Sequence, residues 1–238
     1  MSVNESSPRR GVGALGSAAR RALRDHGPIG LAAWVRDRVG MRWSEMRLGV
    51  DTRGAVDAAD LGIADATGYV PVDPRCFARI MAALDLDATR DVFLDYGAGL
   101  GRPMLLAAQR PFRRVLGIEY DQTLFAAGTR NIESARRRLR CQDIELVHGD
   151  AVDYEVPPQT TVIFFFHPFG GATLERVVDR IEDSLQAHPR RMSIVHIHPR
   201  VEAEVFTTRQ WVESRTQLPS DPYEDKNVVI YTTSGGAA

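Results

Sequence analysis

The stretch that decides the fold spans residues 92–103 and reads VFLDYGAGLGRP. Its apolar start, closed by an acid, indicates a buried parallel strand. Three glycines at alternate positions then predict a tight loop, because glycine adopts positive φ freely and lets a ligand approach the backbone amides. Pro103 fits the first turn of a following helix, where its missing N–H is not needed. Strand, loop and helix together predict a nucleotide-binding cradle.

The glycine spacing separates two classes of cofactor. We expect Gly97 to turn the chain with positive φ, Gly99 to admit a ligand to the backbone amides, and Gly101 to let the helix pack closely on the strand. A dinucleotide fingerprint, G-x-G-x-x-G, places its third glycine three residues after the second, whereas here the interval is shorter. The pattern D-x-G-x-G-x-G that begins at Asp95 resembles motif I of the class I S-adenosylmethionine (SAM) dependent methyltransferases.

Two acids further along the chain strengthen this resemblance. Glu119 ends the apolar segment 114–119, and in a βαβ unit a carboxylate there lies beside the first loop, where it accepts hydrogen bonds from ribose hydroxyls. A cap for the next helix is the alternative role. Asp150 follows the apolar segment 144–148. The resemblance implies that this acid contacts the adenine amino group, with the backbone of Ala151 beside the ring.

The exit of the fourth predicted strand is the expected acceptor side. Residues 161–166 read TVIFFF, which is typical of a central strand, and His167, Pro168 and Phe169 follow. Amino-group methyltransferases carry Asn/Asp-Pro-Pro-Tyr/Phe here, so the likeness is limited to a proline followed by Phe and implies no nitrogen specificity. His167, with an ordinary pKa of about 6.5, is a candidate general base. A hydrogen-bonding wall is its alternative role.

The whole pattern predicts an α/β fold: a doubly wound, mostly parallel seven-stranded sheet with helices on both faces and an N-terminal helical extension. We expect residues 1–27 to be a mobile tail, 28–68 to be the extension and a candidate lid, and 69–234 to be the class I methyltransferase domain. The candidate catalytic residues are His167, from the chemistry of its side chain, and Phe169, whose role the resemblance implies. The cofactor-binding residues that it implies are Tyr69, Asp95, Gly97, Ala98, Gly99, Gly101, Glu119, Tyr120, Asp150, Ala151 and Phe166. A buried structural role is the alternative for Tyr69.

No metal site is predicted. His196 and His198 share one face of a predicted strand, but no third ligand stands at metal-like spacing. His198 is a second candidate for the acceptor pocket. Cys76 and Cys141 match no metal or redox pattern, which indicates reduced thiols and a cytoplasmic protein. The chain also lacks an apolar run near the roughly 20 residues that span a membrane.

Composition bounds the partners. The 238 residues are 44% hydrophobic and 26% charged, with a net charge of −1 and dispersed arginines, so we expect neither a nucleic-acid nor a membrane partner. The resulting hypothesis is a SAM-dependent methyltransferase that moves a methyl group to an oxygen or nitrogen of a small molecule or peptide. Protein side chains remain open as acceptors. The alternatives are a non-catalytic SAM-binding protein and a nicotinamide-dependent oxidoreductase, which the glycine spacing disfavours.

Overall fold

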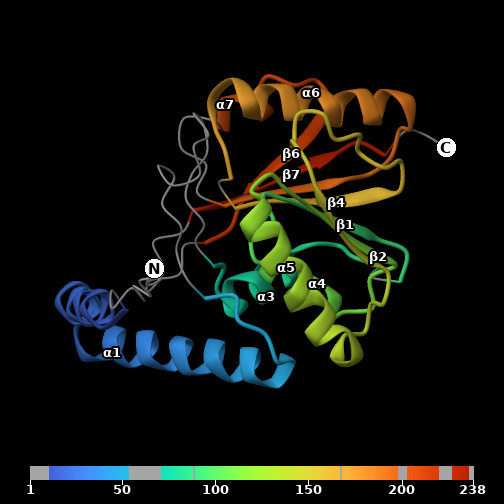
Figure 1. The fold of residues 1–238 in the computed structure, drawn as a ribbon. Helices are drawn as coiled ribbons and strands as arrows, with labels where there is room; N and C mark the ends of the chain where they lie inside the picture. The colour runs from blue at the N-terminus through green and yellow to red at the C-terminus, as the bar shows by residue number, and fades with distance from the viewer. Residues whose placement is uncertain are drawn as a thin grey trace, which may run out of the picture.

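A seven-stranded sheet in the order β3-β2-β1-β4-β5-β7-β6 forms the centre of the protein (Figure 1). The computed structural model describes residues 11–53, 71–87, 89–166, 168–197, 203–219 and 227–235. The strands are β1 (Val92–Tyr96), β2 (Arg114–Glu119), β3 (Ile144–His148), β4 (Thr160–Phe165), β5 (Ser193–Ile197), β6 (Val212–Gln217) and β7 (Val228–Thr233). The first five pair in parallel, and β7 runs antiparallel to both β5 and β6. The predicted fold class is confirmed.

Helices cover both faces of the sheet, as the doubly wound prediction requires (Figure 1). On one face lie α3 (Pro74–Ala83), α4 (Arg102–Ala108) and α5 (Gln122–Ala135), the last followed by the 3-10 turn η1 (Arg136–Arg138). On the other lie α6 (Gly171–Ala187) and the short α7 (Ala203–Thr207). The N-terminal helix α1 (Gly11–Leu48) lies outside the layer of α3, α4 and α5.

Two apolar cores result from the alternation of side chains along each strand. In β1, Phe93 packs into the core beneath α3, α4 and α5, together with Phe77 and Met104. Leu94 and Tyr96 point the other way, into the core beneath α6. Aromatic rings concentrate in both layers, and every residue of β1 is buried. The central strands are therefore covered on both faces, which explains their nearly continuous apolar sequence.

The N-terminal helix begins earlier than the sequence indicated. We expected a mobile tail through residue 27, yet α1 starts at Gly11, and residues 1–10 lie outside the described part. The stretch after Gly11 is rich in alanine and arginine, which are strong helix formers. A kink at Gly27, with φ of 64° and ψ of −163°, precedes Pro28. Proline supplies no amide hydrogen and fits the first turn of the second helical segment.

Candidate functional site

The glycine-rich loop between β1 and α4 is anchored to the end of β2. The backbone amides of Gly97 and Ala98 both donate to the carbonyl oxygen of Ile118, each at 3.0 Å. Gly97 has φ of 70°, and a Cβ atom there would collide with the Cβ of Pro168 in the loop that leaves β4. The expected sharp turn at Gly97 is confirmed, and the loop leaves no room for a side chain.

Gly101 has a different role from the one expected. Its φ is 82°, but a Cβ atom would come no closer than 3.7 Å to the carbonyl oxygen of Gly128. The backbone conformation, rather than close packing, requires glycine here. Close packing depends instead on Gly117 in β2, where a Cβ would collide with the Met104 sulfur, and on Gly128 in α5, where it would lie 2.8 Å from the Gly99 carbonyl oxygen.

Glu119 joins the loop to the start of α5. Glu119 is 7% exposed; its Oε2 accepts a hydrogen bond from the Gly99 amide at 2.7 Å, and its Oε1 accepts one from the Asp121 amide at 2.8 Å. Asp121, and not Glu119, caps α5, because its Oδ1 accepts from the amides of the first helical turn. Burial raises the pKa of Glu119, and the two amide hydrogen bonds partly oppose that rise.

Asp95 is the more exceptional acid of the site. It is the penultimate residue of β1 and is 1% exposed, and among the described residues its Oδ2 has no hydrogen-bond partner. Burial, and then the negative charge of Glu119, raise the pKa of Asp95 well above its usual range. A buried carboxylate oxygen without a partner is costly, and a ligand that carries a positive charge or a hydroxyl group would lower that cost.

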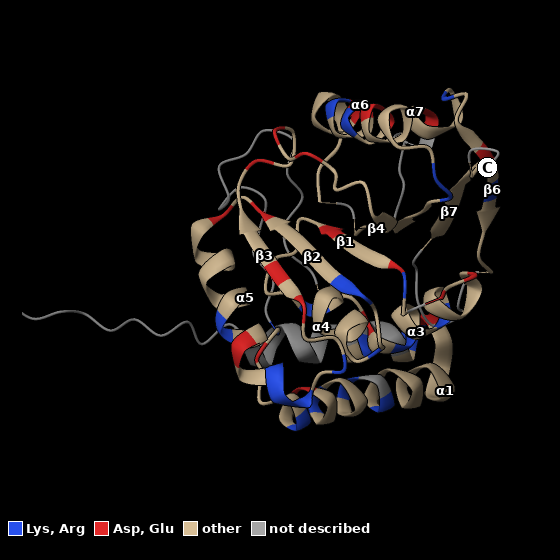
Figure 2. Cartoon of the chain, turned by 90° about the vertical axis from the view of Figure 1, so that its right-hand side faces the viewer, with Lys and Arg blue, Asp and Glu red and all other residues tan. Residues whose placement is uncertain are grey.

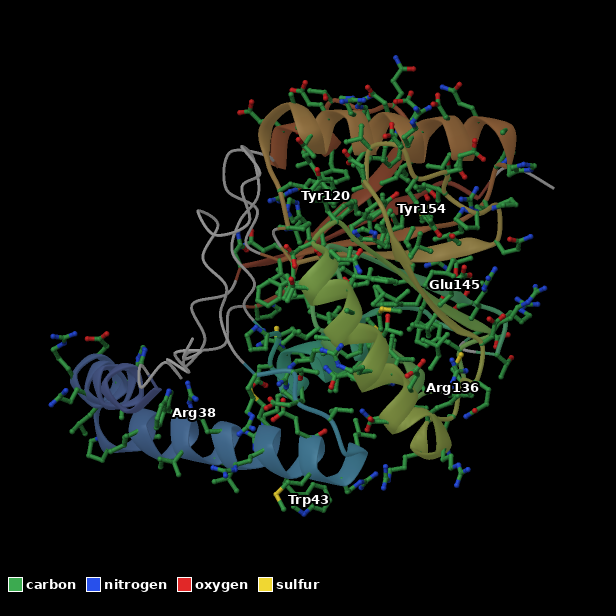
Figure 3. The ribbon with its side chains drawn as sticks, viewed as in Figure 1. Arg38, Trp43, Tyr120, Arg136, Glu145 and Tyr154 are labelled. Atoms are coloured by element: carbon green, nitrogen blue, oxygen red, sulfur yellow. The ribbon has the colours of Figure 1, made fainter. Side chains whose placement is uncertain are left out.

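Four other predicted residues, Tyr120, Asp150, Ala151 and Phe166, lie at or just beyond the carboxyl ends of the strands, where Figure 2 shows acidic residues gathered. Tyr120 is 55% exposed and lies at the end of the sheet near the start of α5 (Figure 3). Asp150 is exposed, and its Oδ1 accepts from the Val152 amide at 3.0 Å. Ala151 and Phe166 are half-buried. The Asp150 carboxylate and the Val152 amide thus lie at the carboxyl edge of the sheet.

Of the two predicted catalytic residues, the structure describes Phe169, which lies in an apolar core. Phe169 is 8% exposed and meets the rings of Tyr96 and Phe165 edge-on, with centroids 6.4 and 6.1 Å away. It belongs to the apolar core beneath α6. His167, Tyr69 and His198 lie outside the described residues. The structure therefore brings together Asp95, the glycine loop and Glu119, and gives Phe169 a packing role as well.

A polar network behind the loop was missed by the sequence analysis. In α5, the side-chain amide of Asn131 donates to the carbonyl oxygens of Leu100 at 3.1 Å and Asp51 at 2.9 Å. Its Oδ1 accepts from the Asp51 amide at 3.1 Å. The available signal was a polar residue on the buried face of α5, three positions after Gly128. This residue links the glycine loop to the segment that follows α1.

The same network contains a buried ion pair between α1 and α4. The Arg102 guanidinium donates to Glu45 Oε1 at 2.5 Å, and the two side chains are 4% and 6% exposed. The Thr52 amide and hydroxyl donate to the same oxygen at 3.1 and 2.9 Å. Arg53 Nε lies 3.3 Å from Oε2. Residues 45–53 are thereby fixed against the back of the glycine loop; the rest of the expected lid segment, 54–68, lies outside the described residues.

Comparison with known proteins depends on the fold rather than on sequence. No family model and no curated protein matches the chain. The RNA methyltransferase from Salinibacter ruber, solved with S-adenosylhomocysteine, has a TM-score of 0.50 and 20% identity, covering 71% of this chain and 97% of its own. Precorrin-6y C5,15-methyltransferase from Geobacter metallireducens has a TM-score of 0.51 and 17% identity, covering 76% and 98%. This chain has the class I methyltransferase fold. The expected sheet and glycine loop of that fold are both present.

One expectation about partners was wrong. We excluded nucleic acid and favoured a small molecule or peptide, yet the Salinibacter ruber protein of the same fold is an RNA methyltransferase. Net charge averages over the whole surface, so a value near zero is compatible with a basic region on one side of a domain. Separately, within the described residues no helix combines the length and the apolar character that crossing a bilayer needs.

Proposed function

We propose that this protein is a SAM-dependent methyltransferase. The observation that carries the proposal is the pair of buried acids, Asp95 and Glu119, beside a glycine loop that leaves no room for a side chain at Gly97. Asp95 Oδ2 has no partner among the described residues, and the burial of both carboxyl groups raises their pKa. A ligand with a positive charge and two ribose hydroxyls fits these acids. Its hydroxyls donate the hydrogen bonds that water would otherwise make, and its positive charge stabilises the ionised carboxylates.

The residues present allow a specific arrangement. Asp95 and the loop amides would hold the methionyl part, Glu119 the ribose hydroxyls, and Asp150 with the Ala151 backbone the adenine ring. Tyr120 and Phe166 would flank these groups at the rim, and Tyr69 would border the pocket. When bound, SAM supplies a methyl group that its sulfonium makes electrophilic. The protein then has to align the acceptor with this methyl group, exclude water and accept a proton.

We also propose that the acceptor atom is an oxygen or nitrogen and that His167 removes its proton. His167 directly follows Phe166 at the exit of β4, and an ordinary histidine pKa of about 6.5 suits proton transfer near neutrality. Phe169 would support this loop through its packing on Tyr96 and Phe165. RNA enters as the first acceptor to assay because a protein of the same fold is named an RNA methyltransferase.

Titration calorimetry with SAM tests the cofactor assignment. Glu119→Ala removes the carboxylate that accepts from the Gly99 and Asp121 amides and that is proposed to hold the ribose. We therefore expect the Kd for SAM to rise at least about tenfold. Glu145→Gln is the matched control, because Glu145 is an exposed acid on the neighbouring strand β3. Equal SAM affinity in Glu119→Ala and the wild type would refute the ribose assignment. Tighter binding of NAD than of SAM would favour the oxidoreductase alternative.

Methyl transfer from radiolabelled SAM to a pool of RNA tests the activity. His167→Ala should lower turnover by about a hundredfold or more and remove the acidic limb of the pH profile. SAM affinity should stay unchanged in that variant, which separates proton transfer from cofactor binding. An unchanged pH profile would eliminate His167 as the base. SAM binding without transfer to any acceptor would favour the non-catalytic alternative.

A further inference from the structure

Helix α1 presents an apolar stripe to solvent on the side opposite its packed face. Val35, Val39, Trp43 and Met46 are 46%, 62%, 60% and 75% exposed. These residues recur at intervals of three or four, which places them on one face of a helix. Trp43 projects away from the rest of the molecule (Figure 3). A soluble protein seldom exposes four large apolar side chains in one row, so the stripe calls for a partner.

The opposite side of the same helix is already used. Ala33, Glu45 and Leu48 are buried, and Glu45 pairs with Arg102 of α4. The Leu48 carbonyl oxygen also accepts from the Arg138 side chain at 3.2 Å. The helix is therefore fixed on the domain by one face, and its apolar stripe is a separate surface.

Arginines border this stripe. Arg38, Arg42 and Arg47 are exposed, and Figure 2 shows basic residues recurring along α1. Arg38 lies over the ring of Trp34 at 4.9 Å, and Arg47 lies over the ring of Trp43 at 5.1 Å. Among the described side chains of residues 28–48, the one acid is Glu45, which the ion pair buries. The surface is thus apolar in the middle and positively charged at its borders.

We propose that α1 is a membrane-docking helix that lies along an anionic lipid surface. Valine, methionine and tryptophan side chains would enter the boundary between headgroups and acyl chains, and the bordering arginines would contact lipid phosphates. A helix with this division of charge binds in the plane of the bilayer and does not cross it. The proposal concerns a surface away from the SAM site and stands independently of the proposed function.

Charge complementarity favours lipid over the two other occupants. A second copy of the chain, related by a twofold axis, would bring the arginines of both helices together, and like charges repel. RNA phosphates would pair with the arginines but would leave Val35, Val39 and Met46 in water. An anionic bilayer matches both the apolar centre and the basic borders.

Cosedimentation of the full chain with lipid vesicles tests the proposal. We expect binding to vesicles that contain about one third phosphatidylserine and little binding to pure phosphatidylcholine vesicles. The double variant Val39→Glu/Trp43→Glu should reduce binding by about a hundredfold, because both side chains would enter the apolar layer. Arg42→Glu should reduce it by about fivefold or more, and added salt should weaken what remains.

A matched control is Arg176→Glu, which reverses the same charge on the exposed face of α6 at the far side of the sheet. It should bind vesicles as the wild type does. An unchanged midpoint of urea denaturation in all variants would show that the domain is intact. Equal binding of the wild type and the double variant to anionic vesicles would overturn the proposal. So would a dimeric wild type that the double variant converts to a monomer, or a loss confined to RNA binding.

Discussion

Two buried acids on either side of the glycine loop have opposite surroundings. Behind the loop, Glu45 accepts hydrogen bonds from Arg102 and from the Thr52 amide and hydroxyl, and Arg53 lies near its second oxygen. In front of the loop, Asp95 is equally buried, yet its Oδ2 has no partner among the described residues, and burial raises its pKa. The charge of Glu45 is therefore compensated within the protein, whereas Asp95 Oδ2 could still accept a hydrogen bond from a ligand.

Whether a buried acid has partners within the protein distinguishes a structural role from a ligand-binding role better than its degree of burial does. A compensated buried charge holds segments together, because removing one partner leaves the other charge stranded. An uncompensated one destabilises the free protein and becomes useful when a ligand supplies the missing charge or donor. The glycine loop lies between the two, so a change on either side is expected to affect it. Four substitutions test this contrast.

The largest effect is expected from Glu45→Ala. It leaves the Arg102 guanidinium buried without its carboxylate, so the free energy of unfolding should fall by about 3 to 5 kcal/mol. Urea denaturation measures the loss. The double variant Glu45→Ala/Arg102→Met should recover much of it, because both charges are then gone. If the double variant were as unstable as the sum of the single changes, the ion pair would not be the cause.

Asn131→Ala should have the next largest effect. Three hydrogen bonds to Leu100 and Asp51 disappear, and two backbone carbonyls and an amide lose their side-chain partner. We expect a loss of about 1 to 3 kcal/mol in the free energy of unfolding. Weaker SAM binding should accompany it, since Leu100 belongs to the glycine loop. Unchanged SAM affinity would show that the loop keeps its shape without the network.

Asp95→Asn should change stability in the other direction. The native pKa of Asp95 lies above its unfolded value, so the native state binds more protons, and stability falls as pH rises through the native pKa. At pH 7 the variant should be more stable than the wild type, because the wild type loses about 1.4 kcal/mol for each pH unit above the unfolded pKa until the native pKa is reached. Thermal unfolding should show this gain vanish as pH falls toward about 4, the unfolded pKa of aspartate. SAM binding should weaken in the same variant.

The smallest effect is expected from Glu145→Gln. Glu145 Oε2 accepts from Arg114 at 2.5 Å, but the two side chains are 51% and 38% exposed. Exposed ion pairs contribute little, so the free energy of unfolding should change by about 0.5 kcal/mol or less. Chemical denaturation beside Glu45→Ala measures the contrast. A loss as large as that of Glu45→Ala would show that burial does not decide the value of an ion pair in this protein.

The sequence predicted the strands and the glycine loop because their signals are local. The strand β2 has the expected bounds, Arg114–Glu119, since apolar β-branched residues and a closing acid define it without reference to other segments. The role of Gly101 was misassigned because close packing on Gly117 and Gly128 depends on contacts between distant segments. The helical residues after Gly11 were missed because a tail-like composition outweighed their alanine and arginine content.

The sequence by itself determined the order of elements, the glycine loop and the positions of Asp95 and Glu119 near the carboxyl ends of their strands, because periodicity and spacing are properties of neighbouring residues. Only the tertiary structure decided that Asp95 Oδ2 lacks a partner within the described part of the chain while Glu45 has several, and that Asn131 joins α5 to the segment after α1. Partners eighty positions apart in the chain meet through folding alone. The contribution of a buried charge to stability depends on those distant partners, and no local sequence pattern predicts them.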